Sequence, residues 1–250
     1  MIRLVHAELV KVRTTRLWLG LLIGAVALDA VGVIATLAIA GTAEGARANI
    51  RPVTTVEDLQ MLVWGGAVIG LFTAVLAATM STGEYRYGTA AGTYLATPSR
   101  GRVLASKMGA AIPIGFAAGL IGGALPVIIA AAWFAVKGDA LPFGLPVLTA
   151  ILEVGLQCTY VAVLSVCVGG ALRSQVVAIL GLLGWGLVVE PLATALVPSL
   201  KRWAPFSGAQ DAFGAPDPLL FGHLAAFGLM LSYVAAVWYV AYWIEGRRDV

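Results

Sequence analysis

Long apolar runs separated by short polar segments make up most of this chain. Six of the runs are long enough to cross the roughly 30 Å of hydrocarbon in a bilayer. None shows the period-two alternation of a membrane-spanning strand, so we expect helices and not a β-barrel. The predicted spans cover residues 17–40, 61–80, 108–136, 147–170, 176–197 and 221–244.

The polar segments between the spans are short enough for one all-α transmembrane domain covering residues 1–250. Between the fourth and fifth spans only residues 171–175 intervene, which predicts a tight hairpin with Arg173 in the turn. Residues 198–220 are rich in Pro, Gly and Asp, and their pattern does not define a structure.

Residues 1–16 have apolar positions at helical spacing, with basic residues away from that stripe. Glu8 and Lys11 form an (i, i+3) pair, and Arg13 adds another positive charge. A basic amphipathic helix just before a span is typical of the membrane interface. The same charges also fit a simple signal for membrane orientation. Both interpretations place this segment at the cytoplasmic surface.

Composition supports the bilayer as the surrounding solvent. Hydrophobic residues make up 60% of the chain and charged residues 12%, whereas a soluble domain carries roughly 25% charged residues. The net charge of +3 is small, and basic residues do not cluster beyond the loops. A nucleic-acid partner is therefore not expected.

The distribution of Lys and Arg predicts the orientation, because cytoplasmic loops are enriched in positive charge. With both termini in the cytoplasm, eleven of the 16 Lys and Arg residues fall on the inner side and five on the outer side. We therefore predict a multi-pass protein of the cell membrane, with residues 81–107 facing the cytoplasm.

The chain lacks motifs for its own chemistry. It has no phosphate-binding G-x-x-x-x-G-K-[ST] loop, and the dipeptide Gly-Lys does not occur. His6 and His223 are distant in sequence and have no ligand-spaced partner for a metal or a serine nucleophile. We expect neither enzymatic activity nor a bound metal or cofactor, and we interpret Cys158 and Cys167 as small apolar filler.

The segment "STGEYRYGTAAGTYLATPSRGRVLASK", residues 81–107, is a charged interruption between two apolar runs. Thr97 is expected to cap a helix whose first turn contains Pro98. Arg100, Arg102 and Lys107 would then face solvent or the membrane surface. A rigid helix here could transmit force from a cytoplasmic motor, whereas the simpler alternative is a solvated loop.

Glu84 ends the second predicted span, where a carboxylate needs hydrogen bonds or a cation to offset the loss of water. Arg86 is the nearest cation in sequence. Three further acids, Asp29, Glu153 and Glu190, fall inside spans. They would line a substrate pathway that favours cationic amphipathic cargo, or else pair with other helices or with arginines of the outer loops.

Glycines recur every fourth residue in the third predicted span, at positions 115, 119 and 123. Small residues at this spacing form a smooth stripe that allows two membrane helices to approach closely. We interpret this stripe as a packing surface and not as a functional site. Pro113 and Pro126 in the same span predict kinks or swivels.

The segment 81–107 resembles the signature of ABC-2-type permeases: an acid, an aromatic or basic pair, Gly-Thr, Leu-x-x-(Ser/Thr)-Pro with a following Arg, and Leu-x-x-Lys. The opening "AELVKVRTTRLW" and "GGALRSQVVAILGLLGWGLVVEPL" also resemble this family, in its drug-exporter branch. The corresponding positions are Glu84, Tyr85, Arg86, Gly88, Thr89, Leu95, Thr97, Pro98, Arg102, Leu104 and Lys107, with one residue fewer between Leu95 and Thr97 than in the signature.

The resemblance implies a six-span subunit that works as a homodimer or heterodimer with a separate ATPase, which binds ATP and Mg. It implies export of a hydrophobic or amphipathic substrate such as a drug or antibiotic. An alternative of a different class would have the same six-span architecture. It is an ATP-independent protein, either a secondary transporter or an immunity or scaffold factor. Contact with the ATPase is expected from Glu84, Tyr85, Arg86, Tyr87, Gly88, Thr89, Thr97, Pro98, Arg100 and Arg102.

Overall fold

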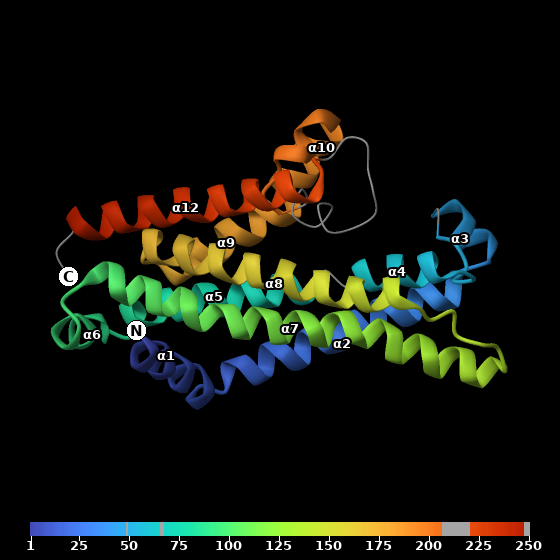
Figure 1. The fold of residues 1–250 in the computed structure, drawn as a ribbon, viewed down its shortest axis with the longest axis horizontal. Helices are drawn as coiled ribbons and strands as arrows, with labels where there is room; N and C mark the ends of the chain where they lie inside the picture. The colour runs from blue at the N-terminus through green and yellow to red at the C-terminus, as the bar shows by residue number, and fades with distance from the viewer. Residues whose placement is uncertain (49, 66–67, 207–220, 248–250) are drawn as a thin grey trace.

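The computed structural model describes residues 1–48, 50–65, 68–206 and 221–247 (Figure 1). Every regular element in these ranges is helical. The elements are α1 (Ile2–Thr14), α2 (Leu17–Ile39), α3 (Ala43–Arg47), α4 (Val56–Trp64), α5 (Val68–Arg86), α6 (Ala90–Ala96), α7 (Arg100–Lys137), α8 (Leu145–Leu172), α9 (Gln175–Gly184), η1 (Trp185–Val189), α10 (Glu190–Leu196), η2 (Pro198–Trp203) and α12 (His223–Arg247).

Six helical segments of the described chain are long and apolar enough to cross a membrane, which makes this a multi-pass membrane protein. Each overlaps one of the apolar runs predicted from the sequence, so the all-helical fold with six candidate spans is confirmed. The segments are Leu17–Ile39, Val56–Arg86, Arg100–Lys137, Leu145–Leu172, Gln175–Leu196 and Leu224–Ile244.

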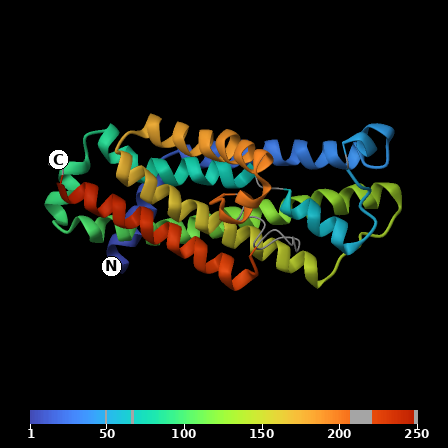
Figure 2. The ribbon, with the colours of Figure 1, turned by 90° about the horizontal axis from the view of Figure 1, so that it is seen from above.

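Helix α8 lies at the centre of the bundle and packs against α7, α5, α12 and α4 (Figures 1 and 2). Its contact with α7 is closest where glycines face it. A Cβ atom on Gly115 would lie 2.7 Å from the Cys158 carbonyl oxygen, and one on Gly119 would lie 2.5 Å from that of Val154. Backbone approaches this close exclude any larger residue, so the predicted packing role of this stripe is confirmed.

The bundle has two different ends. The N-terminus, α6 and the end of α12 gather at one end, whereas α3 and the connection between α7 and α8 lie at the other (Figure 1). We call these the α6 end and the α3 end. Because six is an even number of crossings, α1 and the end of α12 lie at the same end of the bundle.

At each end of the bundle, some helices extend beyond the apolar runs predicted from the sequence. The second crossing begins at Val56, five residues before the predicted Met61, because Thr55 and Asp58 form a capping box. At the α6 end, α5 continues to Arg86 and α7 begins at Arg100. The predicted connecting segment 81–107 is therefore mostly helix, and the true connection covers residues 87–99.

The fourth and fifth spans form the predicted tight hairpin. Arg173 ends α8 in the left-handed conformation, with φ 53°, and α9 begins two residues later. Farther along the fifth span, the π-helical turn η1 precedes Pro191. Proline has no amide hydrogen to bond the preceding turn, so a local change of helix type is expected there. In the connection after the fifth span, η2 is described, whereas residues 207–220 lie outside the described ranges.

Candidate functional site

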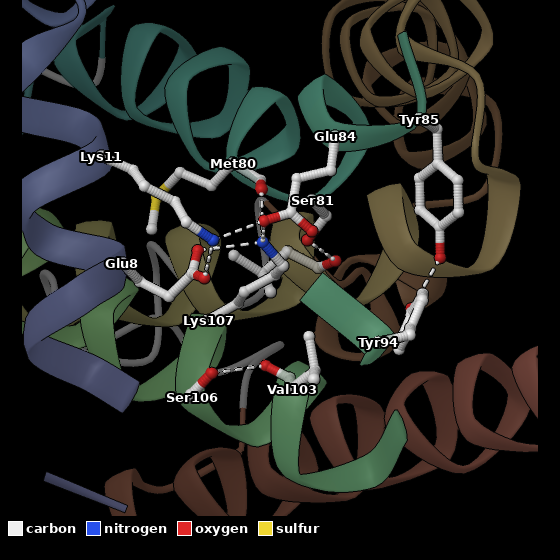
Figure 3. Close-up of polar contacts among 11 residues, drawn as sticks. Glu8, Lys11, Met80, Ser81, Glu84, Tyr85, Tyr94, Val103, Ser106 and Lys107 are labelled. Atoms are coloured by element: carbon white, nitrogen blue, oxygen red, sulfur yellow. Dashed lines mark hydrogen bonds and ion pairs between the residues drawn. The ribbon is translucent and has the colours of Figure 1, made fainter. Parts of the chain in front are cut away.

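Four charged side chains from three helices form one network at the α6 end (Figure 3). Lys11 Nζ on α1 donates hydrogen bonds to Glu8 Oε1 and to Glu84 Oε1, each at 2.6 Å. Lys107 Nζ on α7 donates to Glu8 Oε2 at 2.9 Å and lies 3.1 Å from Glu84 Oε1. Two positive and two negative charges therefore neutralise one another across α1, α5 and α7.

Lys107 is the buried centre of this network. The residue is 4% exposed, and its ammonium has Glu8, Glu84 and the Met80 carbonyl oxygen, at 3.0 Å, as acceptors. A lysine ammonium has three hydrogens, and these three acceptors match them. An ion pair that is buried away from water is stable when its hydrogen-bonding groups all have partners, because these partners offset the loss of hydration.

The one side chain of α1 that is fully buried carries a charge. Glu8, 5% exposed, is the one fully buried residue of α1, while Ile2 at its start is exposed. The close approach is possible because α7 has a glycine opposite α1. A Cβ atom on Gly109 would lie 3.0 Å from Val5 Cγ2. The predicted Glu8–Lys11 pair is confirmed, and its partners on α5 and α7 add to it.

Lys11 lies at the exposed edge of the network, outside the spans. Partial burial disfavours its charged form, but hydrogen bonds to Glu8 and Glu84 outweigh this effect and raise its pKa above the usual value. Lys11 is therefore a stable cation at neutral pH and bridges the two carboxylates.

The Gly-Thr pair after α5 forms the C-terminal cap of that helix. Gly88 adopts φ +69°, a left-handed conformation that favours glycine. The Thr89 amide donates to the Glu84 carbonyl oxygen at 2.9 Å, and the Gly88 amide donates to that of Tyr85 at 3.4 Å. This pair of bonds is a Schellman motif. It ends α5 at Arg86 and turns the chain into α6.

Aromatic and basic side chains connect α6 to its neighbours. The hydroxyl groups of Tyr85 and Tyr94 are 2.9 Å apart and link the end of α5 to α6. The Arg173 guanidinium lies over the Tyr85 ring at 5.0 Å, and Arg86 Nη1 donates to Gln175 Oε1 at 3.1 Å. The end of α5 thus contacts both α6 and the region where α8 turns into α9.

A mixed apolar and basic surface faces outward at the α6 end. We call the exposed side chains of Arg86, Tyr87, Leu95, Pro98 and Arg102 the α6 surface. Leu95 is 85% exposed and Tyr87 is 75% exposed. Exposed aromatic and aliphatic groups flanked by arginine are typical of protein interfaces.

The structure differs from the sequence interpretation in four details at this end. Thr97 does not begin α7 but follows the end of α6, and Ser99 is the N-cap residue of α7. Pro98 therefore precedes the cap and is not in the first helical turn. Lys107 does not face solvent or the membrane surface, because it pairs with Glu8. Arg86 bonds Gln175, so it is not the cation that neutralises Glu84.

Two of the three acids inside spans have partners. Glu153 Oε2 accepts a hydrogen bond from Trp64 Nε1 at 3.0 Å. Glu190, which is buried, accepts from Trp185 Nε1 at 3.0 Å and from the Phe206 amide at 2.9 Å. These contacts favour the pairing alternative, with two indoles and a backbone amide among the partners.

Asp29 differs from both of these acids. It is buried on α2, and its Oδ2 atom has no hydrogen-bond partner. A cavity bordered by α2 and α4 includes Asp29 in its wall, but neither Glu153 nor Glu190 lines that cavity. The three carboxylates lie on α2, α8 and α10 and do not converge on one site.

The sequence interpretation missed several contributors. Lys107 was assigned to the surface and to a motif position, and Met80, Tyr94 and Gln175 were not considered. Lys107 follows the buried pair Val103 and Leu104 by one helical turn, which places all three on the same face of α7. That spacing was the available signal that Lys107 points inward.

Among the described residues, no group of three or more His, Cys, Asp or Glu side chains is placed to hold a metal ion. No family model matches this chain, and no curated protein matches its sequence.

Proposed function

We propose that this chain is the membrane-spanning permease subunit of an ATP-binding-cassette exporter of ABC-2 type. A separate cytoplasmic subunit would bind ATP and Mg, and the substrate would be hydrophobic or amphipathic. The observation that carries this proposal is the network of Glu8, Lys11, Glu84 and Lys107. It ties α1 and two spans together beside the α6 surface.

The contacts around α6 provide a path for mechanical force. A displacement of α6 would reach α5 through the Tyr85–Tyr94 hydrogen bond and α7 through residues 97–99. The ion pairs of Lys107 with Glu8 and Glu84 would then move α1, α5 and α7 as one unit. Packed elements connected in this way shift as rigid bodies between discrete arrangements.

The α6 surface has the chemistry to contact a protein partner. Tyr87 and Leu95 supply apolar area, and Arg86 and Arg102 surround it with positive charge. Aromatic and arginine side chains are enriched where binding energy concentrates. An ATPase with a partly apolar groove and acidic margins would be complementary. This orientation makes the α6 end cytoplasmic, in agreement with the distribution of Lys and Arg.

A second permease chain would complete the transporter, as a copy of this chain or as a paralogue. The resemblance to ABC-2 permeases supports a pair of six-span subunits. The pathway would then form between the two chains, where the exposed apolar faces of their helices meet.

Co-purification from native membranes tests the proposal. The wild-type chain should bring down a protein with a phosphate-binding loop and with ATPase activity. Leu95→Asp, which places a charge in the α6 surface, should release that protein. Val136→Asp at the α3 end is the matched control, because Val136 is similarly exposed, and this variant should retain the ATPase.

Failure to recover an ATPase with the wild-type chain, or equal recovery with Leu95→Asp, would contradict the proposal. That result would favour the alternative of an ATP-independent six-span protein, such as a secondary transporter or an immunity or scaffold factor.

A further inference from the structure

Asp29 is the one fully buried acid for which the described structure provides no partner. It lies in the middle of α2, it is 3% exposed, and its Oδ2 atom makes no hydrogen bond. An ionised carboxylate at such depth in a membrane protein costs roughly 3 kcal/mol or more when nothing compensates its charge. A side chain of this kind indicates a site that is completed by something other than the chain itself.

Asp29 lies in the wall of a cavity of about 530 Å³. The cavity is bordered by α2, by the segment 50–53 and by α4, and it continues to the start of α5. This volume is within the range of about 300–1,000 Å³ that is usual for sites of small organic ligands. Most of its wall is apolar, with Leu28, Val33, Ile50, Val53, Met61 and Leu62 among the lining residues.

The other polar residues of the wall have partners or lie at its edge. Asp58 Oδ2 accepts hydrogen bonds from Thr54 and Thr55 as part of the cap of α4. Thr36 donates its hydroxyl hydrogen to the Gly32 carbonyl oxygen at 2.9 Å.

Arg51 is exposed at the rim of the cavity, and no ion pair joins it to Asp29 in the described structure. Asp29 is thus the buried polar side chain of this wall that can still accept a hydrogen bond from a ligand.

We propose that this cavity binds an organic monocation, with an ammonium group against Asp29 and an apolar body against the surrounding aliphatic side chains. The inference rests on the proposed export function, because it names the class of substrate. A metal ion fits less well, since Ca²⁺ and Mg²⁺ require six or more oxygen ligands and the wall is mostly apolar. The partnered acids Glu153 and Glu190 take no part in this site.

Binding of two compounds of similar size to the purified chain tests this inference. The probes are 4-phenylbutylamine, which is cationic at neutral pH, and 4-phenylbutanol, which keeps a hydrogen-bond donor but is neutral. Titration calorimetry with the detergent-solubilised chain, without any ATPase, separates this test from that of the export function. Wild type should bind the amine at least about tenfold more tightly than the alcohol.

Asp29→Asn should remove this preference while leaving the affinity for the alcohol within about twofold. Asp139→Asn is the matched control, because Asp139 is an exposed acid between α7 and α8, and it should bind both probes like wild type. Gel filtration and thermal unfolding establish that each variant is folded.

Three results would overturn the site: equal affinity of wild type for the two probes, an unchanged preference for the amine in Asp29→Asn, or the same loss of preference in Asp139→Asn. A chain that binds the amine through Asp29 but recovers no ATPase would leave the cation site in place and contradict the export function instead.

Discussion

Lys107 Nζ lies 2.9 Å from Glu8 Oε2, although 99 positions separate the two residues in the sequence. Both side chains are buried, so this contact joins the N-terminal helix to the third span within the packed part of the bundle. The contact places α1 beside the end of the second span, where Glu84 completes the network.

Removing the buried ammonium should destabilise the protein strongly. Lys107→Met leaves Glu8 and Glu84 with Lys11 as their one remaining cation, and breaking a buried ion pair costs about 3–5 kcal/mol. Thermal unfolding in detergent should show a large loss, whereas Lys137→Met at the exposed end of α7 should change stability by less than about 1 kcal/mol.

The double variant Glu8→Gln/Lys107→Met should lose less stability than the sum of the two single losses, because both substitutions break the same contact. Additive losses, or equal effects of Lys107→Met and Lys137→Met, would show that the network does not hold α1 in place.

The contribution of Lys11 to the free energy of unfolding should decrease at high pH. Its hydrogen bonds raise its pKa above the ordinary 10.5, so its stabilising effect is complete below that value and is lost as pH rises through the higher folded-state pKa. The difference in unfolding free energy between wild type and Lys11→Gln should be constant near neutral pH and should shrink above about pH 10.5. A difference that grows with rising pH would contradict this account.

The glycine stripe of α7 should tolerate no side chain. Gly119→Ala places a methyl group 2.5 Å from the Val154 carbonyl oxygen, which forces α7 and α8 apart at a cost of about 1–3 kcal/mol. Gly20→Ala on α2 meets no atom within 4 Å, and it should be neutral or stabilising by up to about 1 kcal/mol. Similar unfolding temperatures for both variants would contradict the observed packing.

The indole of Trp185 should stabilise the fifth span through Glu190. Trp185→Phe removes the donor that lies 3.0 Å from a buried carboxylate, so a loss of about 1–3 kcal/mol is expected in thermal unfolding. Trp18→Phe is the control, because the described structure shows no carboxylate accepting from that indole. If both variants unfold alike, the hydrogen bond to Glu190 has no measurable effect.

The sequence predicts the spans well because apolar length is a local property. The six runs correspond to six helices, and the Glu8–Lys11 pair follows from helical spacing within α1. The partner of Glu84 was not predictable in this way. Arg86 is near in sequence, but the contacts come from Lys11 and Lys107 on other helices, which only the packing of the bundle determines.

The sequence also does not determine which residue of the connection 87–99 caps the start of α7. Thr97 and Ser99 are both good N-cap residues, and the sequence pattern alone favours neither strongly. The structure selects Ser99, since α6 continues to Ala96 and uses Thr97 as its C-terminal boundary. The absence of a partner for Asp29 likewise depends on which residues of α2, α4 and segment 50–53 line the cavity, and those come together only in the folded bundle.

Crosslinking at Tyr87 in living cells is the most direct test of the central claim that the α6 end contacts a cytoplasmic ATPase. Cys158 and Cys167 are both buried, so one cysteine added at position 87 or at the exposed Val136 provides the reactive thiol. We predict that a thiol–amine crosslinker joins Tyr87→Cys to a nucleotide-hydrolysing protein, while Val136→Cys gives no such product and reacts with a membrane-impermeant maleimide added outside. Labelling of Tyr87→Cys from outside the cell, or crosslinking that never captures an ATPase, would contradict the account.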